Sequence, residues 1–170
     1  MVVHPLLLHF PVALLLVGTV ALVIGLLWPG LTRQIAFEGF INGVMALGYA
    51  GLVLTVVTGL FDMQASPKTQ AREGWIVIAV LHILTGVSLM VVYGSLLYRR
   101  FVVLPPTPHP ATTAEPEALS NTGQPDLITQ AQIRRPDWLS LVLAGLGLIL
   151  LVVAGWLGGT LVYEYRVGIS

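Results

Sequence analysis

The sequence contains no cysteine and little charge. Without cysteine the chain forms no disulfide, carries no covalently attached c-type haem, ligates no iron–sulfur cluster through thiolates and offers no thiolate nucleophile. Charged residues make up 9% of the 170 residues, against about 25% in an ordinary soluble domain. The formal net charge is zero, so the charge balance gives no sign of nucleic acid as a partner. Any metal must be held by histidine, aspartate, glutamate or methionine.

Motifs of hydrolytic and nucleotide chemistry are also missing. The sequence has no Walker loop, no dinucleotide fingerprint, no HExxH and no serine-triad motif, so it does not support hydrolysis or nucleotide chemistry. The apolar stretches hold too few ionisable groups for a transport pathway. Whether the chain is an enzyme stays open, and the sequence favours a protein that is not an enzyme on its own.

The chain is rich in long apolar runs. Hydrophobic residues make up 56% of it, and its mean hydropathy is +0.88. Four runs are long enough to cross a hydrocarbon core of about 30 Å as helices. The first has no Lys or Arg before it and is too long for the apolar part of a signal peptide, so we expect a retained helix. We predict an all-α integral membrane protein, an antiparallel four-helix bundle in a single domain over residues 1–170, with helices at about 5–28, 40–61, 74–98 and 138–162.

Residues 99–137, between the third and fourth helices, form a long proline-rich linker. They hold seven of the eleven prolines, a composition that favours extended or disordered backbone. His109 lies in this linker and is interpreted as a solvated histidine.

Basic residues predict the orientation. On one side lie Arg33, Arg99, Arg100, Arg134 and Arg135; on the other lie Lys68, Arg72 and Arg166. Because cytoplasmic loops carry the excess of positive charge, we expect a multi-pass membrane protein with both termini outside and linker 99–137 in the cytoplasm.

The antiparallel order brings the unusual residues to one membrane face. His4 and His9 open the first helix, Asp62 ends the second, and His82 lies near the start of the third. At 1.5 Å per residue, His9 lies about 6 Å and His82 about 11 Å inside its helix. Similar depth on two helices is what a shared ligand needs. His4 and His9 are about 140° apart around a regular helix, so both cannot face one ligand.

Small and helix-distorting residues surround these histidines. Ala79, Thr85 and Gly86 share a helical face with His82 and leave a groove for a flat group. On the fourth helix, Gly155 and Gly159 form a GxxxG pair that allows close helix approach. Pro5 suits a helix start, and an interior Pro11 kinks or delays the helix, which can aim His9 into the bundle.

These residues allow three cofactors. His9 and His82 are the axial metal ligands that a b-type haem requires, and one of them could ligate a chlorophyll-type pigment. Arg72, with Lys68 on the same side, could meet haem propionates. Alternatively, the histidines and Asp62 could hydrogen-bond a quinone and relay protons.

The ends of the chain resemble a known family. The segments "HPLLLHFPVALLL", "GLFD", the "LH" of the third helix and "GWLGGTLVYEYRVG" are similar to a bacterial family of predicted membrane proteins whose domain has no assigned function and is in some proteins joined to a Rieske iron–sulfur domain. The resemblance implies a four-helix inner-membrane domain with a redox association, and it implies no reaction. Met63 stands where the family often has an aromatic residue, and no Rieske segment is attached, so an electron partner would be another polypeptide. The signature falls on His4, Pro5, His9, Phe10, Pro11, Asp62, His82, Trp156, Gly158, Gly159, Tyr163 and Gly168.

Two functions lead as expectations, ahead of a third, a pigment-binding accessory of a photosynthetic complex. The first is a membrane subunit of an electron-transfer complex that binds a b-type haem or a quinone near the outer face. In it His9 and His82 are ligands, and Gly158 and Gly159 leave room for the macrocycle or for a close helix. The second is a non-catalytic scaffold or assembly subunit of a larger respiratory or photosynthetic complex. Either function gives the chain the lipid bilayer and other membrane subunits as partners.

Overall fold

The computed structural model describes residues 4–28, 35–65, 74–103 and 137–165. In chain order these form α1 (His4–Leu27), α3 (Ile35–Ala65), α4 (Trp75–Tyr98), the π-helical turn η2 (Arg99–Val103) and α6 (Trp138–Tyr163). The described residues contain no strand. The four long helices are each long and apolar enough to cross a membrane, and the prediction of an all-α four-helix membrane bundle is confirmed.

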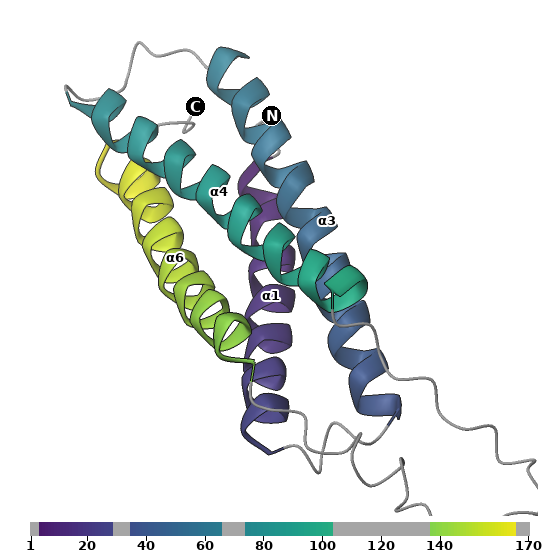
Figure 1. The fold of residues 1–170 in the computed structure, drawn as a ribbon. Coiled ribbons are helices and arrows are strands. Elements are labelled where there is room, and N and C mark those ends of the chain that lie inside the picture. Colours follow the sequence, from purple (N-terminus) through teal and green to yellow (C-terminus); the bar gives the residue numbers. More distant parts are fainter. Residues whose placement is uncertain (1–3, 29–34, 66–73, 104–136, 166–170) are drawn as a thin grey trace, which may run out of the picture.

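The helices pack as two antiparallel pairs (Figure 1). α1 lies along α3, and α4 lies along α6. Contacts between α3 and α4 and between α1 and α6 join the two pairs. This arrangement places the start of α4 and the end of α6 at the same end of the bundle as the start of α1.

Local sequence accounts for the helix ends. α3 is longer than the expected 40–61 at both ends, and Glu38 in its first turn suits the positive end of the helix dipole. Gly74 precedes α4 with φ of +89°, a left-handed conformation that glycine adopts without strain. Pro5 lies in the first turn of α1, whereas Pro11 lies inside it and leaves one backbone carbonyl without its helical partner.

Exposed aromatic side chains mark both ends of the helices. Trp28, Tyr98 and Trp138 lie exposed at one end, and Phe61 and Tyr163 at the other. Tryptophan and tyrosine favour the two membrane–water interfaces. The helical segments between these two sets of side chains are long and apolar enough to cross the hydrocarbon.

Glycines bring α1 and α3 into close contact. A Cβ placed on Gly48 would lie 3.0 Å from Cγ and 3.1 Å from the backbone nitrogen of Leu15, and one placed on Gly51 would lie 3.0 Å from Cβ of Pro11. Lipid tails are as apolar as leucine, so close packing rather than the hydrophobic effect holds helices together in a bilayer. The two helices can approach this closely only because these positions lack side chains.

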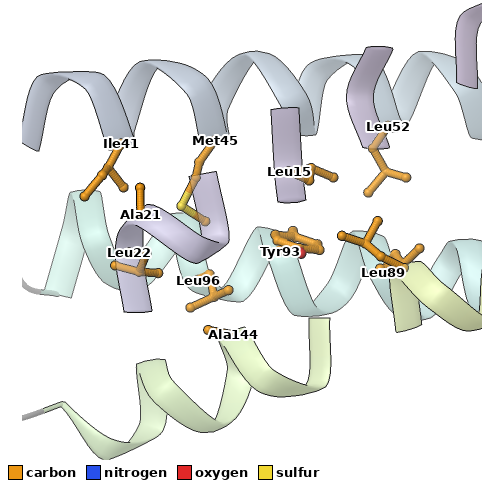
Figure 2. Packing of buried hydrophobic residues seen from close by; sticks show 11 residues of the cluster. Leu15, Ala21, Leu22, Ile41, Met45, Leu52, Leu89, Tyr93, Leu96 and Ala144 are labelled. Carbon is orange, nitrogen blue, oxygen red and sulfur yellow. The ribbon is translucent and has the colours of Figure 1, made fainter. Parts of the chain in front are cut away.

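The buried core centres on Tyr93, which is 0% exposed (Figure 2). Its hydroxyl lies 3.0 Å from Oγ1 of Thr19 on α1. Thr19 uses its own hydrogen to bond the Leu15 carbonyl at 2.6 Å, so Tyr93 donates to Thr19. This hydrogen bond joins the α4–α6 pair to the α1–α3 pair inside the core. The buried apolar residues around it are Leu15, Ala21, Leu22, Ile41, Met45, Leu52, Leu89, Leu96, Ala144 and Leu151.

Replacing Gly48 by alanine tests the close approach. The new methyl group would meet the side chain and backbone of Leu15, so we expect a loss of about 1–3 kcal/mol. Gly43 on the same helix meets no described atom within 4 Å, so Gly43→Ala should leave stability unchanged or raise it by up to about 1 kcal/mol. Thermal unfolding in detergent measures both variants; equal stabilities would contradict the assignment of Gly48 to the contact.

Candidate functional site

His82 lies on the packed face of α4. It follows Ala79 by three residues and precedes Leu89 by seven, and both of these side chains are buried. Residues at such spacings share one helical face. The imidazole is half-buried and lies about 11 Å along the axis from Trp75 at the start of α4. His82 therefore lies between helices, inside the segment Trp75–Val103 that is long and apolar enough to cross a membrane.

The imidazole of His82 packs against α6 at Gly158. A Cβ placed on Gly158 would lie 3.1 Å from Cε1 of His82 and 3.8 Å from each ring nitrogen. The ring thus meets the bare backbone of α6 edge-on, with Cε1 foremost. Gly158 leaves room for this imidazole.

The neighbouring glycines of α6 face elsewhere. Alanine-like Cβ atoms on Gly155 and Gly159 would meet no described atom within 4 Å. The GxxxG pair therefore makes no close helix contact within the described part of the chain. The close approach of α6 to α4 uses Gly158 and Gly147 instead, where Tyr93 lies 3.0 Å from a Cβ placed on Gly147.

The small residues beside His82 are packing positions. Ala79 is buried, and a Cβ on Gly86 would lie 3.5 Å from Cγ2 of Val56 on α3. Thr85 turns its hydroxyl back to the Leu81 carbonyl at 2.8 Å. The face around His82 is therefore occupied in part by α3 as well as by α6.

His9 has a different environment from His82. Its side chain is exposed, and it lies about 160° around α1 from Pro11, which packs on α3. Pro11 therefore belongs to the face that α1 buries, and His9 to the opposite one. The structure does not turn His9 toward the packed face of its own helix.

The other predicted site residues are only partly described. His4 is the first residue of α1 and Asp62 lies near the end of α3, but their side chains lie outside the described set. Arg72, Lys68 and His109 lie outside the described residues altogether. Within the described part, no three His, Asp or Glu side chains gather in a way that could hold a metal ion.

A polar cluster lies at the end of the bundle opposite His82. Arg99 in η2 pairs with Asp137 at 2.8 Å, directly before α6. Asp137 also accepts a hydrogen bond from Ser140, and Arg100 donates from Nε to Asn42 of α3. Two consecutive arginines thus join α4 to both α6 and α3. Partial burial raises the pKa of Asp137, but the bonds from Ser140 and Arg99 outweigh it and hold that pKa below its ordinary value.

Sequence reasoning missed this cluster and the contact of Tyr93 with Gly147. The signal for the cluster was an arginine pair directly after one apolar run and an aspartate directly before the next. The signal for the aromatic contact was a spacing of eleven residues, which separates His82 from Tyr93 and also Gly147 from Gly158.

The adjacent glycines of α6 give a matched test of the His82 contact. Gly158→Ala puts a methyl group against the imidazole, so we expect it to lower stability by about 1–2 kcal/mol. Gly159→Ala, which meets no described atom within 4 Å, should be neutral or stabilising. Thermal unfolding in detergent compares the two; a loss confined to Gly159→Ala would overturn the placement.

Asp137→Asn tests the ion pair. Because the native pKa is lowered, the ionised pair contributes fully at neutral pH, and the contribution is lost as pH falls through that pKa. We expect a loss of about 1 kcal/mol at pH 7, since both side chains are mostly but not fully buried. Unfolding measured across pH should show the two proteins converging in acid; a constant difference would exclude this origin.

Comparison with known proteins places the whole chain in one family. No curated protein and no solved structure matches it. A family model described as Predicted membrane protein (DUF2231) matches residues 1–170, in agreement with the resemblance of the helix ends and with the four apolar helices. The chain therefore belongs to the DUF2231 family of predicted membrane proteins.

Proposed function

We propose that this protein is a membrane subunit of an electron-transfer complex and that His82 binds its redox cofactor, a quinone or a b-type haem, near one membrane face. The observation that carries the proposal is the position of His82: an ionisable side chain at membrane depth, seated between α4 and α6 against Gly158. Ionisable groups within the bilayer are costly, and they mark functional sites by default.

The contact with α6 favours a quinone over a haem. A haem on His82 needs a clear plane several ångströms wide beside a ring nitrogen, and both nitrogens lie 3.8 Å from a Cβ placed on Gly158. Haem, or a chlorophyll-type pigment, would therefore have to fit beside the backbone of α6. A quinone needs only one hydrogen bond of about 2.7–3.2 Å from the imidazole to its carbonyl. The imidazole can also pass a proton to that oxygen.

His9, Asp62 and Arg72 have secondary parts in this proposal. His9 would be the second axial ligand only if a haem is bound. Its side chain is exposed on α1, so it would have to turn toward the bundle to reach such a haem. Asp62 would take part in proton relay to a quinone, and Arg72 would pair with haem propionates. None of the three is needed for a quinone held by His82 alone.

The same proposal includes an orientation in the membrane. Arg99 and Arg100 lie at the end of the bundle opposite His82. If this end is cytoplasmic, as the positive-inside rule favours, then His82 lies near the outer face of the bacterial inner membrane.

A scaffold subunit is the second candidate, and one observation favours it. Trp156 is 71% exposed on α6, and a Cβ on Gly155, on Gly159 or on Gly145 would meet no described atom within 4 Å. A face with small residues is suited to contact with a helix of another subunit. In this alternative His82 has a structural role between α4 and α6, and the protein binds no cofactor.

A reduced-minus-oxidised optical spectrum, with quinone extraction, tests the proposal. The unchanged protein and the variants His82→Ala and His9→Ala are each purified in mild detergent from the native membrane. Ser88→Ala is the control, because Ser88 is exposed on α4. We expect co-purified quinone in the unchanged protein and the control, and a loss of about tenfold in His82→Ala. A b-type band lost in both histidine variants would instead identify haem. A flat spectrum without quinone, with complex assembly intact in His82→Ala, would contradict the proposal and favour the scaffold.

A further inference from the structure

Two ring-to-glycine contacts join α4 to α6. His82 packs against Gly158, and Tyr93 packs against Gly147, with Cζ and Oη of Tyr93 both 3.0 Å from a Cβ placed on that glycine. On each helix the two positions are eleven residues apart, which is three turns and about 16 Å. Because the helices are antiparallel, both rings meet glycines in the same axial register.

A shift of α6 by one turn would break the contact of Tyr93 with Gly147. Tyr93 would then face Leu143 or Ala144 in one direction and Leu150 or Leu151 in the other, and each of these carries a side chain where Gly147 has none. In a bilayer no hydrophobic driving force compensates for a poor fit between helices. The fit of Tyr93 against Gly147 therefore selects one register of α6 on α4.

Tyr93 is also fixed from its other side. Its ring is fully buried, and its hydroxyl donates to Thr19 of α1. The phenol thus touches α6 and α1 at once. The position of α4 along the bundle axis, and with it the depth of His82, is set at Tyr93 relative to α6 and α1.

We propose that Tyr93 and Gly147 are a positioning pair for His82. They fix the register of α6 on α4, and this keeps Gly158 against the imidazole about 16 Å away. The pair does not touch the cofactor. The effect of this pair on cofactor binding rests on the proposed function of His82. Its effect on the register of α6 on α4 does not.

Cysteine cross-linking measures the register directly. The chain has no cysteine of its own, so an introduced pair is unambiguous. In the observed register His82 lies opposite Gly158. Three residues earlier on α4, Ala79 therefore lies opposite Leu161 of α6, and Leu157 is one turn away from Leu161. Two proteins report the register in native membranes: Ala79→Cys with Leu161→Cys, and Ala79→Cys with Leu157→Cys. We expect disulfide formation to favour the first pair.

Variants of the positioning pair should shift this preference. Gly147→Ala pushes a methyl group into the Tyr93 ring, and the ratio of the two cross-links should fall about fivefold. Tyr93→Ala removes the ring instead and should lower the ratio as well. Gly145→Ala is the matched control, because it meets no described atom within 4 Å. Combining Gly147→Ala with Tyr93→Leu removes the colliding atoms and should raise the ratio above that of Gly147→Ala alone.

The outcomes separate this proposal from the proposed function. A ratio unchanged in both Gly147→Ala and Tyr93→Ala would overturn the positioning pair, whatever the cofactor. A ratio that shifts in both variants and rises again in the double variant supports it, even if the unchanged protein carries no quinone or haem. Where quinone does co-purify, the same variants should lose it, although His82 itself is intact.

Discussion

The packing of this bundle depends on helix backbones that touch at glycines. In water, buried apolar area would hold four such helices together, but in a bilayer their surfaces gain little by leaving lipid. Stability then depends on how closely the backbones approach. Gly48 and Gly51 serve this purpose between α1 and α3, and Gly147 and Gly158 between α4 and α6. Each receives a larger side chain of the neighbouring helix, and His82 is one of those side chains.

This constraint joins the candidate site to the fold. The same contact that packs α4 on α6 also places an imidazole at membrane depth. Under the proposed function, a ligand at His82 would have to fit beside the α6 backbone. A small planar molecule that accepts one hydrogen bond suits such a position better than a macrocycle.

The sequence predicts the fold well because run length and hydropathy suffice to identify spanning helices. The depth of His82 follows from its distance to the helix start. Its partner does not follow, because these helices are apolar all round and a uniform apolar surface does not reveal which face is buried. For this reason the sequence suggests His9 and His82 as a facing pair, whereas the structure turns His82 to Gly158 and leaves His9 exposed on α1. The sequence also does not predict the pairing of Arg99 with Asp137, because the two residues lie 38 positions apart in the chain.

The most direct test of this account is the distance between His82 and α6 in a bilayer. Solid-state NMR of the protein labelled with ¹⁵N in its histidine rings and ¹³C at glycine Cα detects such a contact through space. The account predicts a ring-to-glycine correlation that disappears in both His82→Gln and Gly158→Ala. If no correlation depends on both residues, His82 does not lie against α6, and the proposed site is contradicted.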